Sequence, residues 1–321
     1  EHQGKVHFAN VAAPSLPAEI AGLVEYIDGL DDFLPEPAQS RPPAPEGNIS
    51  GGRHVLAPDD YAVIYAIQPA LQRGIDGTGQ KIAIVGQSGI DLNDMRLFRT
   101  RYRLAANDPE VILYPGSRDP GFTGAQGEAN LDLQWAGAVA RNAKLIYVYG
   151  TSALSALNHV VDQNLAPIVS VSFSAGCEAQ NSAAVLASFR NLAQTANAMG
   201  ITWVNSSGDG GPAGCDLNTS TIAQNGFGPR FPSIIPEVTA VGGTELNDRG
   251  GSYWRATNDA NLASALSYIP EIPWNESEAG VTIAAGGGGI SSFFGRPQWQ
   301  EGSGIGNETF RKSPDLSLIH I

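Results

Sequence analysis

Positive charge is scarce in this sequence, and no apolar run is long enough to cross a membrane. Lysine and arginine number 19 against 32 acidic residues, which gives a formal net charge of −13. No basic patch of the kind that binds nucleic acid is present, so we expect neither a nucleic-acid partner nor a membrane segment. An acidic, lysine-poor surface suits an extracellular protein. No signal peptide is visible, and the start at Glu1 indicates an excised piece of a longer chain.

Histidine and cysteine are also sparse, which leaves little for a metal site. The five histidines are scattered, and none has the spacing typical of metal ligands. The two cysteines form no Cys-x-x-Cys pair, so we expect no metal site in this sequence. Cys177 and Cys215 each lie just past a predicted strand, and the two strands should be neighbours. A disulfide could therefore join two loops at the carboxyl edge of the sheet, and two unrelated buried thiols are the alternative.

The composition is that of a globular protein with a sizeable core. Of the 321 residues, 42% are hydrophobic and 16% are charged, while 38 glycines and 21 prolines indicate many turns and loops. Residues 34–55 are rich in proline and have the composition of a linker. Residues 1–33, with a predicted strand at 5–10 and a predicted helix at 17–27, precede the linker. Residues 56–321 follow it as the main domain.

The main domain alternates short apolar runs with helical segments. We predict strands at residues 81–86, 111–114, 143–149, 168–173, 201–205 and 238–241, and helices at 57–67, 94–102, 128–140, 153–163 and 183–199. This alternation indicates an α/β fold with a mostly parallel central sheet and helices on both faces. Functional sites in such sheets form beyond the carboxyl ends of the strands. After residue 245 the pattern gives way to a long loop region.

The stretch from Gly127 to Ala138 follows a glycine-rich turn and has the pattern of an opening helix. Glu128 and Asp132 are four residues apart, so they lie one above the other on one helix face. If both are buried, one holds a proton and its pKa rises, and a pair that shares a proton can serve as acid and base. Acids that merely complement the dipole at a helix start are the alternative.

Three further stretches could carry chemistry. The backbone around Ser172, Phe173 and Ser174 leaves the sheet through small polar residues and could pair with an extended peptide, or could form an ordinary strand-to-helix turn. Asp209 follows a buried strand. If desolvated, it would be neutral at acid pH and could donate a hydrogen bond to an oxyanion, and a simple turn is the alternative. Glycines 286–289 could flank a substrate groove or form a surface loop.

Together these stretches resemble the sedolisins, the serine-carboxyl peptidases with a subtilisin-like fold. The resemblance covers nearly the whole chain. It rests on motifs spread along the sequence: Leu56 to Tyr61, Gly77 to Gly79, Ile82 to Val85, Gly127-Glu128 with Asp132, Ser170 to Phe173, Ser206 to Asp209, Phe231-Pro232, Val238 to Thr244, Trp274-Asn275, and the glycine run closing on Arg296 to Gln300.

The resemblance implies a role for each candidate residue. Glu128 would be the general base, where subtilisins use histidine, Asp132 would orient it and share its proton, and Asp209 would be the protonated oxyanion donor. A carboxylate is a weak base at neutral pH, so an acidic optimum has a physical reason. The substrate cleft would be lined by Ser172, Phe173, Ser174, Gly286, Gly287 and Gly288.

The resemblance further implies a secreted, zymogen-type endopeptidase that acts on polypeptides, and we expect a monomer. Residues 1–33 resemble the tail of the family's propeptide, which would be an intramolecular partner, and the linker at 34–55 would hold the maturation site. The family's calcium site would lie beyond the end of this chain.

The nucleophile is where the sequence departs from the family. The family's serine stands in a Gly-Thr-Ser segment that opens a helix and is followed by a proline. Here Pro314 to Leu318 resemble the strand upstream of that segment, and Ser317 is not in the motif. We therefore expect a C-terminally incomplete peptidase domain that is inactive as it stands.

Two other interpretations stay open. A non-catalytic peptide-binding module on the same fold would keep the groove without turnover. A nucleotide-dependent doubly wound enzyme would need a phosphate loop after the first strand, which Val85 to Gly89 match poorly.

Overall fold

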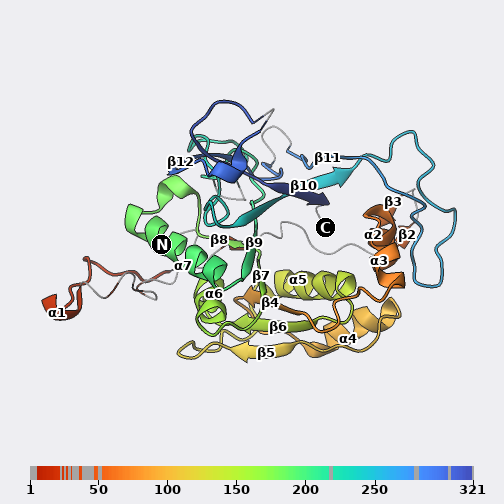
Figure 1. Cartoon of the computed structure of the whole chain (residues 1–321), viewed down its shortest axis with the longest axis horizontal. Coiled ribbons are helices and arrows are strands. Elements are labelled where there is room, and N and C mark those ends of the chain that lie inside the picture. The colour runs from red at the N-terminus through yellow and green to blue at the C-terminus, as the bar shows by residue number, and fades with distance from the viewer. Residues whose placement is uncertain are drawn as a thin grey trace.

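The computed structural model describes residues 6–21, 24, 27, 30, 36–37, 47–49, 53–216, 220–277, 282–302 and 305–319. Its centre is an eight-stranded sheet in the order β11-β10-β9-β7-β4-β6-β5, with β14 paired to β10 (Figure 1). These strands are β4 (Lys81–Gly86), β5 (Glu110–Leu113), β6 (Lys144–Tyr149), β7 (Ile168–Val171), β9 (Thr202–Ser206), β10 (Thr239–Leu246), β11 (Glu271–Pro273) and β14 (Leu316–Ile319). Only β11 pairs antiparallel within this sheet, so the predicted mostly parallel sheet is confirmed.

The central strands form where apolar residues run without interruption. Ile84 and Val85 of β4 are fully buried, and so are Tyr147 and Val148 of β6. Successive residues of a strand point to opposite faces. Both faces of these strands are therefore covered, as expected for a parallel sheet.

Helices supply the cover on each face (Figure 1). The main ones are α4 (Leu92–Arg101), α5 (Gln126–Val139), α6 (Ala153–Asp162) and α7 (Ala183–Ala198). The largest core cluster includes Leu157 of α6, Phe189 of α7 and Trp203 of β9. A second cluster, on the opposite face, joins Met95 of α4 and Leu133 of α5 to the central strands. Helices α4 and α5 therefore share one face, and α6 and α7 share the other.

The chain builds the sheet outward from β4 in two directions. Strands β6 and β5 extend it on one side. After β6 the chain crosses through α6 and places β7 on the other side of β4, followed by β9 and β10. Where the strand order reverses, a crevice forms beyond the carboxyl ends of the two strands. The β4–β7 boundary is therefore the expected place for a site.

Two sequence expectations in the main domain need correction. The helix predicted at 57–67 is two helices, α2 (Pro58–Ile64) and α3 (Gln68–Gln72). The first ends because Ala66 turns to a φ of 53°, which no helix residue adopts. The long loop predicted after residue 245 holds over 247–270, but β11, β12 (Gly289–Gly295), η2 (Gln298–Gln300), β13 (Phe310–Ser313) and β14 follow it.

The N-terminal elements are short. They are α1 (Ala18–Ala21), β1 (Glu36–Pro37), β2 (Gly47–Ile49) and β3 (Arg53–Val55), with β8 (Phe173–Ser174) and η1 (Glu178–Gln180) later in the chain. The strand predicted at 5–10 is wrong for residues 6–8, which are not extended in a sheet. Most of the predicted linker at 34–55, and most of the predicted helix beyond Ala21, lie outside the described residues. No described helix has the length and apolarity to cross a bilayer.

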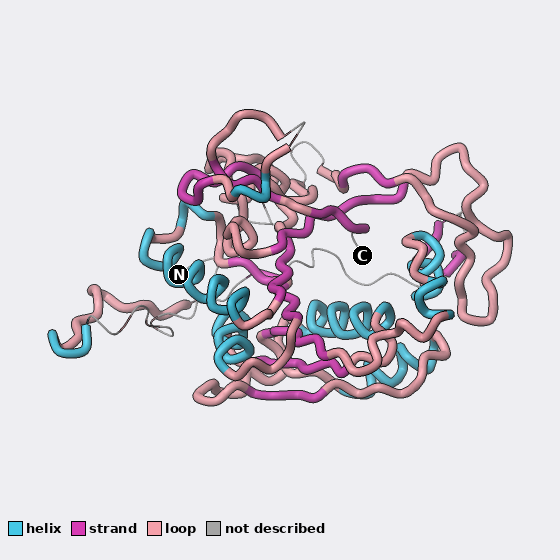
Figure 2. Tube along the Cα trace, in the orientation of Figure 1, coloured by secondary structure: helices cyan, strands magenta, loops and turns pink. Residues whose placement is uncertain are grey.

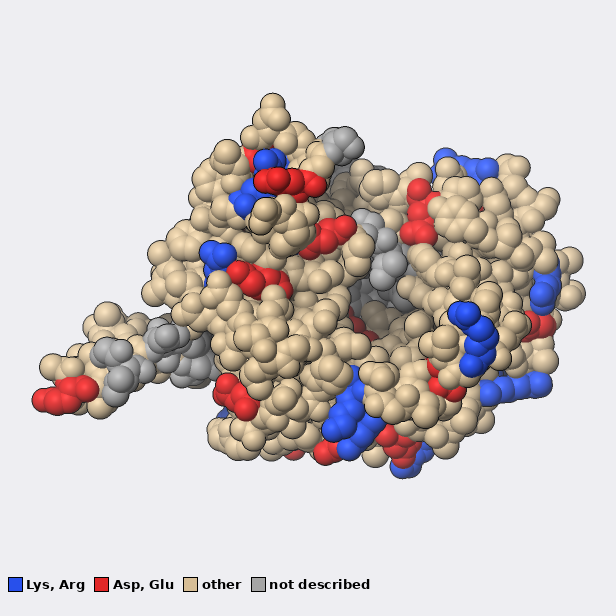
Figure 3. Space-filling model, viewed as in Figure 1, with Lys and Arg blue, Asp and Glu red and all other residues tan. Residues whose placement is uncertain are grey.

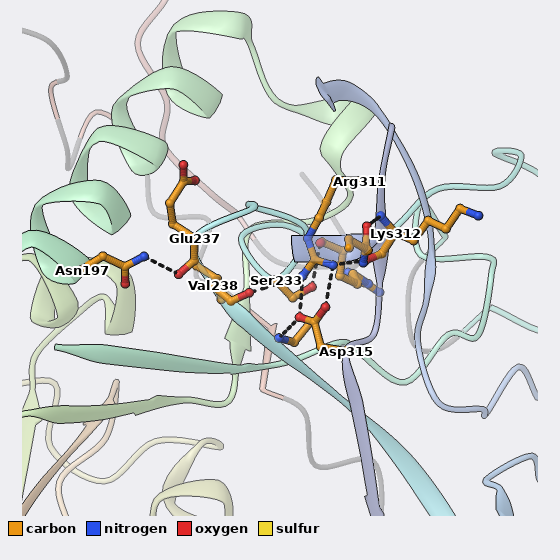
Figure 4. A network of polar contacts seen from close by, with 10 residues as sticks. Asn197, Ser233, Glu237, Val238, Arg311, Lys312 and Asp315 are labelled. Carbon is orange, nitrogen blue, oxygen red and sulfur yellow. Dashed lines mark hydrogen bonds and ion pairs between the residues drawn. The ribbon is translucent and has the colours of Figure 1, made fainter. Parts of the chain in front are cut away.

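Arg311 is fully buried and ties β13 to the pair formed by β10 and β14. Its Nη1 and Nη2 donate to Asp315 at 2.7 and 2.5 Å, and Nη2 also donates to the carbonyl of Val238 at 3.3 Å (Figure 4). Asp315 accepts from the backbone nitrogen of Ala240 at 2.9 Å. The guanidinium lies 5.0 Å from the ring centroid of Trp299. This ion pair fixes the segment that leads into β14.

Replacing Arg311 tests this role. We expect Arg311→Ala to lower the free energy of unfolding by about 3–5 kcal/mol, because the Asp315 carboxylate loses its partner in a buried setting. Urea unfolding measures the change. Arg96→Ala is the control: its pair with Asp108, at 2.6 Å, is exposed and should contribute no more than about 1 kcal/mol. Equal losses from the two variants would contradict the assignment.

Candidate active site

The candidate residues gather at the carboxyl edge of the sheet, near the β4–β7 boundary. Glu128 and Asp132 lie on the first two turns of α5, Ser172 follows β7, and Asp209 follows β9. Figure 2 shows α5 running beside the central strands. The face seen in Figure 3 is hollowed between α5 and the region of β10 and β11. The elements that carry these four residues therefore open on the same edge of the sheet.

The start of α5 is fastened to the end of β4. The backbone nitrogen of Thr123 donates to Ser88 Oγ at 2.9 Å, and its Oγ1 donates to the carbonyl of Gln87 at 3.1 Å. The same Oγ1 accepts from the backbone nitrogen of Ala125 at 3.1 Å. These bonds fix where the first helical turn begins and so where Glu128 lies.

Glu128 and Asp132 stand one turn apart on α5, the first buried and the second half-buried. Glu128 is 3% exposed, and Oδ2 of Asp132 is also buried. Ser172 Oγ donates to Oδ1 of Asp132 at 2.9 Å. Burial raises the pKa of Asp132 to about 7, against the lowering effect of the Ser172 hydrogen bond. An aspartate with this pKa keeps its proton in acid solution, as a proton-sharing pair requires.

Tyr147 lies close to this pair and was not among the candidates from sequence. Its hydroxyl donates to the carbonyl of Ser88 at 2.7 Å. Burial, and then the charge of Asp132, raise the pKa of Tyr147, so it stays neutral. Gly86 makes room for the ring, because a Cβ there would lie 2.1 Å from the tyrosine hydroxyl. Tyr147 belongs to an apolar strand, and this pattern does not indicate that its hydroxyl lies beside the acidic pair.

Asp209 lies in the turn after β9 and is 7% exposed. Gly208 before it has a φ of 98°, a conformation that favours glycine. The carbonyl of Asp209 accepts from the backbone nitrogen of Ala285 at 2.8 Å. The turn therefore holds a buried acid at the same edge of the sheet as the Glu128–Asp132 pair.

The glycine run packs directly behind this turn. A Cβ on Gly287 would lie 2.1 Å from the carbonyl oxygen of Ser207, and one on Gly286 would lie 2.8 Å from that of Gly243. Ser207 Oγ donates to the carbonyl of Gly287 at 2.8 Å. The backbone of Gly286, Gly287 and Gly288 thus supports the Asp209 turn, and a role in lining the cleft stays a prediction.

An extended segment of the chain already lies on the backbone singled out for peptide pairing. Strand β1 pairs antiparallel with β8, with Glu36 opposite Ser174 and Pro37 opposite Phe173. The side chains of Phe173 and Ser174 are buried. The backbone of β8 therefore makes the hydrogen-bonded contacts, as in β-strand addition.

Cys177 and Cys215 form a disulfide, with an S–S distance of 2.06 Å. The bond joins the segment after β8 to the loop after Asp209. Gln180 Nε2 adds a hydrogen bond to the carbonyl of Cys215 at 3.0 Å. The peptide-pairing strand and the turn that carries Asp209 are therefore linked covalently.

A Gly-Thr-Ser segment occurs at Gly150 to Ser152 and was not among the candidates from sequence. The segment follows β6 and opens α6, but Ala156 stands where the motif has proline. Ser152 Oγ accepts from the backbone nitrogen of Ser155 at 3.3 Å and so caps α6. Because α6 covers the face opposite to α5, this serine is placed as a helix cap rather than beside Glu128.

In the part of the chain that the structure describes, no three His, Cys, Asp or Glu residues cluster as ligands for an ion. We therefore assign no calcium ligand to these residues.

No family model matches the sequence. Kumamolisin of Bacillus sp. (strain MN-32) is 28% identical over 320 residues, covering 95% of this chain and 53% of kumamolisin. Sedolisin of Pseudomonas sp. (strain 101) is 28% identical over 336 residues, covering 98% and 53%. Human tripeptidyl-peptidase 1 is 26% identical over 300 residues, covering 89% and 47%. The chain thus spans about half the length of these curated relatives.

A solved structure shows the same architecture. Pseudomonas sedolisin, a serine-carboxyl proteinase complexed with two molecules of pseudo-iodotyrostatin, superposes with a TM-score of 0.64 at 27% identity. The match covers 82% of this chain and 70% of that one. The predicted subtilisin-like fold class is confirmed by this likeness.

The raised pKa of Asp132 predicts how stability depends on pH. The folded state keeps a proton that the unfolded state releases between pH 3.8 and about 7, so this contribution is complete below pH 3.8 and lost as the pH rises through about 7. Asp132→Asn removes it. We expect urea unfolding at pH 4, 6 and 8 to show a smaller loss of unfolding free energy with rising pH for the variant. The difference from the parent between pH 4 and pH 8 should be on the order of 4 kcal/mol.

The exposed Asp162 supplies the control, because its replacement by asparagine should leave the profile of the parent intact. Parallel profiles for the parent and Asp132→Asn would contradict the buried, protonated state of Asp132.

Proposed function

We propose, from the premise that the chain belongs to the sedolisin family, that it carries the base, the orienting acid and the oxyanion acid of a serine-carboxyl peptidase. The observation that carries the proposal is the pair of acids at the carboxyl edge of the sheet, in which Glu128 and the Oδ2 atom of Asp132 are buried. Strand β1 on β8 supports a polypeptide substrate, because that backbone accepts an extended chain.

The hydrogen bond from Ser172 to Asp132 supports the following assignment of protons. At acid pH Asp132 holds its proton, and Oδ1 is occupied by the Ser172 hydroxyl, so Oδ2 carries the proton. A protonated Asp132 adds no negative charge beside Glu128, which can then ionise and accept the proton of a serine nucleophile. Asp209, when protonated, would donate to the oxyanion. This division of roles requires acidic solution.

The nucleophile is not assigned to a residue of this chain. The one Gly-Thr-Ser segment of the 321 residues ends in Ser152, which caps α6. We propose that the chain as given does not hydrolyse peptides, and that turnover belongs to a protein that also contains the missing motif. Secretion, a propeptide at residues 1–33, maturation within 34–55, a calcium requirement and a monomeric state belong to the same proposal.

A second candidate function is peptide binding without catalysis. The pairing of β1 with β8 favours it, because that pairing needs neither Glu128 nor a nucleophile. The two candidates differ in whether a bound peptide is cut.

Hydrolysis of an internally quenched peptide at pH 4 by the full-length protein tests the proposal. We expect Glu128→Gln to lower kcat/KM by about 10³-fold or more, since the base is lost, and Asp209→Ala to lower it about 10²–10³-fold. Glu110→Gln, at an exposed acid of the edge strand β5, should leave kcat/KM unchanged. Activity that survives Glu128→Gln would refute the assignment of the base.

Two comparisons refine the same assay. The 321-residue chain should leave the peptide uncut, and cutting by this chain would overturn its predicted inactivity. Cleavage of a peptide with a blocked N-terminus would indicate an endopeptidase. Cleavage restricted to free N-termini would instead favour the tripeptidyl-peptidase type found among the relatives.

A further inference from the structure

Ser172 stands between two strands that contact different partners. Strand β7 ends at Val171 inside the central sheet, where it pairs with β4 and β9. Strand β8 begins at Phe173 and pairs with β1. The backbone of Ser172 is therefore held on both sides, which fixes the point from which its side chain extends.

The hydroxyl of Ser172 makes a specific contact with the acidic pair. It donates to Oδ1 of Asp132 at 2.9 Å. The other oxygen of that carboxyl, Oδ2, is buried and makes no hydrogen bond within the described residues. A serine hydroxyl has one proton to give, and here that proton goes to Asp132. Ionisation of Asp132 is therefore supported by this one bond.

The other ionisable groups near Asp132 do not favour its charge. Glu128 lies one turn earlier on α5 and is an acid. Tyr147 on β6 is neutral, and its hydroxyl proton is given to the carbonyl of Ser88. On α4, Asp94 accepts from Asn130 at 2.9 Å. The groups that face this part of α5 are thus acidic or neutral, which makes the Ser172 bond the favourable contact.

We propose that Ser172 is a positioning residue whose hydroxyl fixes the orientation and the proton of Asp132. By occupying Oδ1, it leaves Oδ2 as the oxygen that carries the proton of the neutral acid. By donating to the carboxyl, it also stabilises the ionised form. The side chain therefore serves the acidic pair, while the backbone of β8 that follows it pairs with the extended segment β1. The role in catalysis rests on the proposed function, whereas the effect on Asp132 does not.

Carboxyl ¹³C NMR of the aspartate-labelled chain tests this proposal without needing activity. The Asp132 signal is assigned by its loss in Asp132→Asn. In Ser172→Ala we expect the titration midpoint of Asp132 to rise by about one pH unit, because a hydrogen bond to the charged form is lost. Ser172→Thr keeps a hydroxyl and should keep the midpoint of the parent.

Two controls make the result decisive. Ser170→Ala changes a serine two residues earlier on β7 and should not move the midpoint. Ser172→Cys offers a weaker donor, so its midpoint should lie between those of the parent and the alanine variant. If the alanine variant fails to fold by near-UV circular dichroism, the cysteine and threonine variants decide. An Asp132 midpoint that is the same in the parent and the Ser172 variants would overturn the proposal.

The full-length protein separates this proposal from the peptidase assignment. If it is active, Ser172→Ala should shift the pH profile of kcat/KM in the same direction as the NMR midpoint, and Ser172→Thr should restore it. If Glu128→Gln does not affect hydrolysis, the peptidase assignment fails, and the NMR result for Ser172 still stands on its own.

Discussion

The candidate site depends on the packing of one helix, α5, against strands β4 and β6. Ala129 and Leu133 are buried with Ile84 of β4 in one apolar cluster. They stand one residue after Glu128 and Asp132, so the packing that stabilises the helix also carries both acids into the buried edge. Burying a leucine side chain contributes about 1.5–3 kcal/mol, and a protonated Asp132 adds no charge repulsion to Glu128. Packing therefore decides where the acids lie.

Backbone contacts determine the opposite side of the site. The Asp209 turn is supported by glycines that approach its carbonyls more closely than any side chain would allow, and the Cys177–Cys215 disulfide links it to the segment after β8. The helix places Glu128 and Asp132 through side-chain packing, while the turn places Asp209 through main-chain hydrogen bonds. Substitution of a glycine in this run would thus displace the turn without touching the acidic pair.

Much of this arrangement could be predicted from sequence, because continuous apolar strands specify a parallel sheet and its carboxyl edge. The sequence pattern did not predict the end of α2, where the backbone of Ala66 takes a positive φ. It also did not predict β12 and β13, which pair with each other outside the central sheet. The contact of Ser172 with Asp132 could not be predicted, because it spans 40 residues and depends on how far β7 runs before it ends. Tyr147 could not be predicted either, because its position in an apolar strand is that of an ordinary core residue.

The acidic pair could have been an ordinary helix start, with carboxylates that complement the dipole. For Asp132, the size of the helix-dipole effect and the size of the desolvation effect argue against an ordinary helix start. A helix N-terminus favours a negative charge by about 0.3–1 kcal/mol, and the effect fades beyond the first turn, whereas Asp132 is the seventh residue of α5. Burial moves its pKa from 3.8 to about 7 in the opposite direction, which corresponds to on the order of 4 kcal/mol. Desolvation outweighs the dipole, so this acid is held protonated at the pH where a carboxylate base such as Glu128 would work.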